Sequence, residues 1–170
     1  MRIEEEIKLD YSDVLFRPKR STLKSRSEVN LKRKYKFKHS KLSWEGVPIF
    51  ASNMDGVGEV GVATKLATFN MMTALTKQHT NKEIKFFQKN KHIHNFVALS
   101  CGTSRESYLR LSKLIKKNPK FKFICIDVAN GYSENFSKFV SEVRKKNPTK
   151  TIIAGNVVTA DMTQELVLSG

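Results

Sequence analysis

The segment FKFICIDVANGYSENFSKFVSEVRKKNPTKTIIAGNV, residues 121–157, decides the fold. Residues 121–128 and 151–157 are apolar at most positions, which is typical of strands buried on both faces. Between them, apolar residues recur at the three- and four-residue spacing of an amphipathic helix: Phe136, Phe139, Val140 and Val143. Because a helix that joins two buried strands is the usual crossover of a parallel sheet, this segment predicts a βαβ unit.

The same alternation extends outward in both directions. Upstream, the pattern predicts strands at residues 48–54, 71–76 and 96–100 and helices at residues 57–69, at 81–91 and after Ser104. Downstream, Thr159 is the predicted N-cap of a last short helix. Five consecutive βα units without a reversal are typical of a (β/α)8 barrel.

The length limits how much of such a barrel is present. A complete barrel usually takes about 250 residues, whereas this sequence has 170. We therefore expect an α/β fold that is an incomplete TIM (β/α)8 barrel, with about five βα units and truncated before the sixth strand. The partial barrel is expected at residues 48–170, after an N-terminal arm and strand at residues 1–47. That strand is predicted within residues 31–38, where Tyr35 and Phe37 alternate with lysines.

The chain is strongly basic, with 31 Lys+Arg against 16 Asp+Glu and a net charge of +15. Such a charge raises nucleic acid as a partner. Pairs of lysines at predicted helix C-termini are explained by the helix dipole, however, and we predict no specific nucleic-acid partner. No apolar run approaches the ~20 residues that cross a bilayer, and the acidic N-terminus does not resemble a signal peptide. We therefore expect a cytoplasmic protein without a membrane partner.

The cysteines and histidines form no recognisable constellation. Cys101 and Cys125 stand in apolar runs, which predicts buried, reduced thiols rather than nucleophiles. No CxxC or Cys/His spacing for zinc occurs, so no metal site is predicted. The histidines show no ligand spacing, and His92 and His94 are expected at the surface before the third strand.

Polar residues follow the predicted strands, at the edge where parallel α/β folds place their functional groups. Taken singly, each is explained by helix capping or by hydrogen bonds within a loop. Together they outline one rim of a site: Asn53, Asp55, Lys77, Thr103, Asp127, Asn130 and Asn156.

A second interpretation arises from residues 56–61, which match GxGxxG between a strand and a helix. An NAD-binding Rossmann fold would place an acid at the end of the next strand, where Lys77 follows Thr76 instead. A lysine suits a 2′-phosphate, so an NADP-type Rossmann domain remains an alternative. Two residues separate the strand from the first glycine, which disfavours the fingerprint.

Several segments together resemble the N-terminal half of the GMP reductases, in the IMP dehydrogenase/GMP reductase family. The resemblance covers nearly the whole chain and is strongest in residues 8–29, which include Arg-Pro-Lys-Arg-Ser-Thr; it continues in residues 46–55, 125–134 and 154–159. The sister IMP dehydrogenases typically insert a module after the second strand and have His-Gly-His where this chain has Asn130-Gly131-Tyr132. The resemblance thus favours the reductase, with an IMP dehydrogenase-type protein as an alternative.

The resemblance implies NADPH-dependent reductive deamination of GMP to IMP and ammonia, in a homotetramer. Carried over by position, the implied cofactor contacts include Ser25 and Arg26, which would reach a neighbouring subunit's site. The others are Lys77, Asp127, Val128 and Ala129, together with the approach segment Glu106–Ala129.

The family's catalytic cysteine stands in a Gly-rich loop after the sixth strand, which has no counterpart in these residues. No catalytic residue is therefore assigned here, and neither Cys101 nor Cys125 takes that role. Gly56 replaces a usual threonine, and Thr76 and Gln78 replace usual histidines beside Lys77. We expect this chain alone to be inactive, and a non-catalytic truncated remnant or interaction piece is the alternative to an enzyme.

Overall fold

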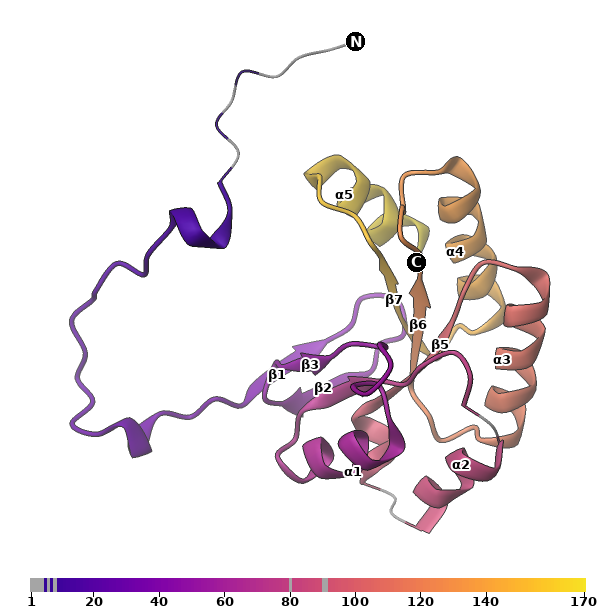
Figure 1. Cartoon of the computed structure of the whole chain (residues 1–170), viewed down its shortest axis with the longest axis horizontal. Helices are drawn as coiled ribbons and strands as arrows, with labels where there is room; N and C mark the ends of the chain where they lie inside the picture. The colour runs from indigo at the N-terminus through magenta and orange to yellow at the C-terminus, as the bar shows by residue number, and fades with distance from the viewer. Residues whose placement is uncertain (1–4, 6, 8, 80, 90–91) are drawn as a thin grey trace. The chain divides into compact units, whose positions relative to one another are not determined.

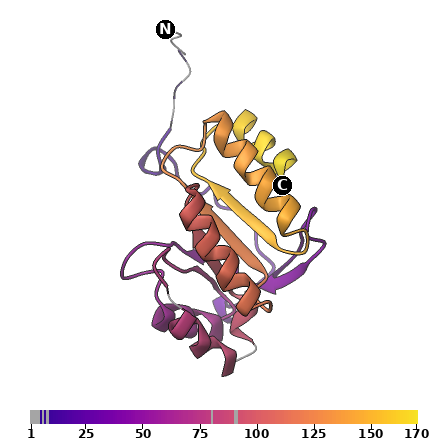
Figure 2. The same ribbon diagram turned by 90° about the vertical axis from the view of Figure 1, so that its right-hand side faces the viewer.

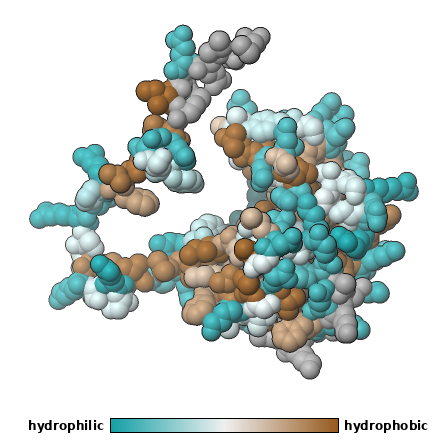
Figure 3. Space-filling model, in the orientation of Figure 1, coloured by the Kyte–Doolittle hydropathy of each residue, from teal (hydrophilic) through white to brown (hydrophobic). Residues whose placement is uncertain are grey.

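The computed structural model describes residues 5, 7, 9–79, 81–89 and 92–170. The chain divides into two units, Met1–Asn30 and Leu31–Gly170. The first unit has two single-turn 3-10 helices, η1 (Tyr11–Asp13) and η2 (Arg26–Glu28), neither of which contains a buried residue. Large apolar side chains are exposed along it (Figure 3), among them Leu15 and Phe16.

The second unit is built on a five-stranded parallel sheet (Figure 1). Its strands are β3 (Phe50–Ala51), β4 (Met72–Ala74), β5 (Val97–Cys101), β6 (Phe123–Asp127) and β7 (Thr151–Gly155). They pair in the order of the sequence, β3-β4-β5-β6-β7, and each pair is parallel. The sheet curls into part of a barrel, as the sequence predicts. The Rossmann alternative is wrong, because that fold needs a point where the strand order reverses.

Helices follow the strands. They are α1 (Val60–Thr68), α2 (Asn81–Lys85) continued by η3 (Phe86–Lys89), η4 (Ile93–Asn95), α3 (Arg105–Lys117), α4 (Glu134–Lys146) and α5 (Ala160–Ser169). Figures 1 and 2 show α3, α4 and α5 side by side along one face of the sheet. The expected end of the second helix at Lys91 lies outside the described residues. No helix in the described part of the chain is long and apolar enough to cross a membrane.

Helices α3 and α5 begin where the sequence predicts, because their caps are local, whereas α1 begins at Val60 and not at the predicted residue 57. The Ser104 hydroxyl accepts a hydrogen bond from Ser107 N–H at the start of α3. The Thr159 hydroxyl accepts one from Met162 N–H at the start of α5. The apolar face of α4 is buried against the sheet, with Phe136, Val140 and Val143 each at most 2% exposed.

The core lies between the sheet and these helices. Leu99, Ile124 and Ile126, on β5 and β6, belong to this core and are almost fully buried. Burying each such side chain contributes roughly 1.5–3 kcal/mol. His94 is also buried, with its ring 4.7 Å from the Phe121 ring, so the expectation of a surface position is wrong for His94. His92 is exposed, as expected.

An antiparallel hairpin, β1 (Arg33–Lys36) and β2 (Ser43–Gly46), covers the amino ends of the strands. Trp44 donates through Nε1 to Asn95 O at 3.0 Å, just before β5. Phe37 packs edge-on against Phe123, the first residue of β6. Because the hairpin covers the amino ends of the strands, a ligand-binding site is expected at their carboxyl ends. The alternation predicts β1; β2 was not predicted.

The three glycines of residues 56–61 have different surroundings. Gly56 has a positive φ of 76°, which glycine adopts at little cost. A Cβ on Gly58 would lie 2.6 Å from Ala74 O and 3.0 Å from Thr76 N, so only glycine allows the loop to approach the end of β4 so closely. Gly61 lies within α1, and a Cβ there would meet nothing within 4 Å. A dinucleotide fingerprint needs its third glycine for close helix–strand packing, and Gly61 has no such contact.

Gly58→Ala is expected to destabilise the protein by about 1–3 kcal/mol, because the new methyl group would collide with backbone atoms at the end of β4. Gly61→Ala is the matched control and is expected to stabilise α1 by roughly 0.5–1 kcal/mol. Urea unfolding of both variants measures the two changes. Equal stabilities for the two variants would contradict the close approach at Gly58.

Candidate functional site

Lys77 and Asp127 meet at the carboxyl ends of the strands. Lys77 follows β4 and Asp127 ends β6, so the pair reaches across the end of β5. Lys77 Nζ lies 3.3 Å from Asp127 Oδ2 and donates to Asp127 O at 3.2 Å. The two side chains are 36% and 31% exposed, and such an ion pair contributes about 0–1 kcal/mol to stability. The ion pair orients both side chains, because each charge holds the other at the carboxyl ends of the strands, here called the rim.

Gly102 lies next to this pair, directly after β5. A Cβ at Gly102 would lie 4.0 Å from Lys77 Nζ and 3.9 Å from Ser107 Oγ. Any larger side chain there would extend beside the ammonium group. Glycine therefore leaves space for a ligand next to Lys77.

The two thiols lie below this rim, and both are protonated at neutral pH. Burial raises the pKa of Cys101 to about 12, and the neighbouring Cys125 adds to the shift. Burial also raises the pKa of Cys125 to about 11, although a hydrogen bond with Ser100 opposes it. The charge of Lys77 lowers both pKa values without overcoming burial. Because the thiolate is the nucleophile, this agrees with the prediction of structural cysteines.

A groove of about 520 Å³ opens between the loops that follow β5 and β6. Its lining includes Thr103, Val128, Asn130, Ser133 and Asn135. Helices α3 and α4 begin beside it, and helix N-termini attract anions through their free N–H groups and dipoles. The helix N-termini therefore favour an anionic group at this end of the groove, whose lining also includes Lys138 and Glu142.

The loop after β6 is held by its neighbour. Val128 N–H donates to Gly155 O at 2.8 Å, and Asn156 N–H donates to Val128 O at 2.8 Å. Tyr132 Oη accepts from Val158 N–H and Thr159 N–H, at 2.8 and 2.9 Å. These bonds fix Val128 at the groove and leave Ala129 exposed next to it.

The other positions of the predicted cofactor site are Ser25, Arg26 and the segment Glu106–Ala129. Ser25 and Arg26 belong to the unit Met1–Asn30, where Ser25 caps η2 and both side chains are exposed. The segment Glu106–Ala129 runs along α3 and returns through β6, so its two ends lie at the carboxyl ends of the strands. The middle of that segment, including Leu111 and Phe121, is buried in the core.

Two contacts at this rim were not predicted, although Arg110 lies within the predicted segment Glu106–Ala129. Arg110 on α3 donates through its guanidinium to Lys77 O. His79, which is 6% exposed, bonds to Gly58. No local sequence signal indicates either contact, because each joins elements that are distant in the chain. Among the described residues, no group of three or more His, Cys, Asp or Glu is placed to hold a metal ion.

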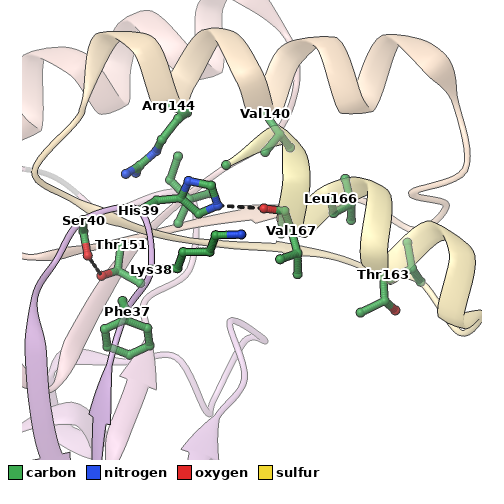
Figure 4. Close-up of a pocket in the computed structure, with 14 residues that line it drawn as sticks. Phe37, Lys38, His39, Ser40, Val140, Arg144, Thr151, Thr163, Leu166 and Val167 are labelled. Atoms are coloured by element: carbon green, nitrogen blue, oxygen red, sulfur yellow. Dashed lines mark hydrogen bonds between the residues drawn. The ribbon is translucent and has the colours of Figure 1, made fainter.

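A separate cavity of about 330 Å³ lies where the turn of the hairpin meets α4, β7 and α5 (Figure 4). His39 Nε2 lies 2.7 Å from Val167 O, and Ser40 Oγ lies 2.7 Å from Thr151 Oγ1. Its lining includes Lys38 and Arg144 and no acidic residue. None of the predicted site residues lies in this cavity.

The sequence of this chain is similar to a known protein family and to individual members of it. A family profile described as "IMP dehydrogenase / GMP reductase domain" matches residues 8–170. The GMP reductases of Klebsiella pneumoniae and Tolumonas auensis are 52% and 51% identical to this chain over 172 residues. Those alignments cover all of this chain and 50% of each relative. The chain thus spans about half the length of the curated relatives it matches.

A solved structure has the same fold. The inosine 5′-monophosphate dehydrogenase of Legionella pneumophila superposes with a TM-score of 0.73 at 25% sequence identity. The superposition covers 94% of this chain and 47% of that enzyme.

Alkylation of the thiols tests their raised pKa values. Iodoacetamide at about pH 8 is expected to leave Cys101 and Cys125 unmodified in the folded protein, because burial keeps both protonated and inaccessible. In denaturant the thiol pKa returns to about 8.5, and both should react. Mass spectrometry locates the label. Rapid labelling of either cysteine in the folded protein would contradict the assignment as structural thiols.

Proposed function

Because the chain belongs to the IMP dehydrogenase/GMP reductase family, we propose that it forms the cofactor side of a GMP reductase. The reaction is the NADPH-dependent reductive deamination of GMP to IMP and ammonia. Relatives that are 52% and 51% identical are GMP reductases, whereas the IMP dehydrogenase is 25% identical, which favours the reductase. The single observation that supports the cofactor role is the Lys77–Asp127 pair beside the open space at Gly102.

The residues of this site fit a nicotinamide dinucleotide. Lys77, Asp127, Val128 and Ala129 would hold the cofactor at the rim, and Gly102 leaves space beside the ammonium group. Bound NADPH would supply a hydride to the purine.

Each group has a defined part in binding. Lys77 is an N–H donor whose charge Asp127 already balances, so the pair suits a polar, uncharged group such as an amide or hydroxyl. The cofactor phosphates would lie in the groove near the N-termini of α3 and α4, where backbone N–H groups favour anions. In the proposed homotetramer, Ser25 and Arg26 would reach the site of a neighbouring subunit, and Arg26 would add a cation for a phosphate.

A second candidate is a piece that binds the cofactor without catalysis. Both thiols of these residues are buried and protonated, so neither provides the nucleophile that the resemblance implies. We propose that the 170-residue chain binds NADPH and does not itself convert GMP, and that the reaction takes place in the cytoplasm when the rest of the barrel is supplied.

Lys77→Met is expected to weaken NADPH binding by about 10- to 100-fold, because charge-assisted hydrogen bonds contribute roughly 1.5–3 kcal/mol. Lys65→Met is the matched control, since Lys65 is an exposed lysine on α1 and should leave affinity unchanged. Titration calorimetry with NADPH measures both variants and the unaltered chain. Equal affinities for the two variants would remove Lys77 from the site.

A turnover assay separates the candidate functions. The purified chain with GMP and NADPH is expected to form no IMP, whereas addition of the C-terminal half of a GMP reductase relative as a separate polypeptide should restore NADPH oxidation. IMP formation by the chain alone would disprove the non-catalytic assignment. Oxidation of IMP with NAD by the complemented protein, without reduction of GMP, would instead support the IMP dehydrogenase-type alternative.

A further inference from the structure

His79 lies in the loop between β4 and α2, two residues after Lys77, and is 6% exposed. Its Nε2 lies 2.9 Å from Gly58 O. Because a carbonyl oxygen only accepts, Nε2 carries a proton and donates it to Gly58. The same carbonyl accepts Thr76 N–H at 3.0 Å. The carbonyl oxygen of Gly58 thus accepts hydrogen bonds from the Thr76 backbone and from the His79 side chain, which lie on either side of Lys77 in the sequence.

Carboxylates flank the ring at both nitrogens. Glu59 Oε2, at the N-cap of α1, lies 3.8 Å from Nε2. Glu83 Oε2, on α2, lies 3.6 Å from Nδ1. The ring therefore joins the loop before α1 to helix α2 through one hydrogen bond to Gly58 O and the nearby carboxylates of Glu59 and Glu83. The hydrogen bond to Gly58 O satisfies the Nε2–H of this buried imidazole.

The approach of the two loops also depends on Gly58. Since a Cβ there would lie 2.6 Å from Ala74 O, the backbone of this loop lies directly against the end of β4. The hydrogen bonds from Thr76 N–H and His79 Nε2 to Gly58 O also hold this loop against the end of β4. Arg110 adds a third restraint, because its guanidinium donates to Lys77 O. The backbone of Lys77 is thereby restrained by hydrogen bonds of Thr76 and His79 and at its own carbonyl oxygen.

We propose that His79 is a positioning residue for Lys77, which rests on the cofactor role proposed above for that lysine. Lys77 has a long, flexible side chain, and its Nζ reaches Asp127 from a backbone that lies two strands away. A displacement of about 1 Å at a site can reduce its effectiveness about 100-fold. Restraining the Lys77 backbone therefore determines whether the ammonium group stays at the rim.

Two substitutions separate the hydrogen bond from the bulk of the ring. His79→Phe keeps a planar ring and removes the Nε2–H donor to Gly58 O. His79→Gln places an amide N–H donor near the position of Nε2 and keeps the bond to Gly58 within reach. His94→Phe is the matched control, because His94 is as deeply buried but lies before β5, at the opposite end of the strands.

Hydrogen exchange and NADPH affinity are the two measurements, both on the full chain and below its melting temperature. For His79→Phe, we expect exchange of the Thr76 amide, which donates to Gly58 O, to accelerate at least tenfold and the NADPH dissociation constant to rise about tenfold. His79→Gln should recover most of both. His94→Phe should change neither, although it lowers the melting temperature.

Each outcome decides the proposal. Unchanged exchange at Thr76 in His79→Phe overturns it, whatever the cofactor result. Faster exchange with unchanged NADPH affinity overturns the positioning role and leaves His79 a structural residue. If the unaltered chain binds no NADPH, the proposed function fails and the positioning role fails with it, while exchange still shows whether His79 restrains the loop. Recovery by His79→Gln in both measurements supports the proposal.

Discussion

Parallel pairing of strands in chain order is the constraint on which the second unit depends. Each strand from β3 to β6 is followed by a crossover that returns the chain to the same edge of the sheet before the next strand begins. Crossovers of this kind are right-handed almost without exception, so successive helices lie on one side. With helices on one side only, the sheet curls, and the carboxyl ends of all its strands converge. Lys77 and Asp127 can meet across the end of β5 only because of this convergence.

Residues at the carboxyl ends of the strands contribute unequally to the stability of the fold. The Lys77–Asp127 pair is partly exposed and contributes little to folding, but it fixes two polar groups beside a space with no side chain. The thiols below it are buried, and burial raises their pKa values. Stability in this region therefore comes from the apolar layer rather than from the rim pair, whose cofactor role is the proposal made above.

The sequence predicts features that depend on neighbouring residues. The 3–4 spacing in α4, the Ser104 and Thr159 caps and the buried strands depend on short-range patterns, and the structure contains them. Features that depend on distant contacts were missed. His94 is buried because Phe121 packs against it, and β2 forms because β1 pairs with it. The rim residues Lys77 and Asp127 were identified from their positions after strands, but the role of His79 depends on Gly58, 21 residues earlier. Ser25 and Arg26 rest on resemblance alone and remain predictions.

The position of Trp44 has a practical consequence. It is the single tryptophan of the chain, it is 7% exposed, and it stacks with Tyr35 on the hairpin and contacts Phe96 beside β5. Its fluorescence therefore reports the docking of the hairpin at the amino ends of the strands. Since the Lys77–Asp127 pair lies at the other end of the same strands, Trp44 is an intrinsic optical probe of folding that is remote from that pair.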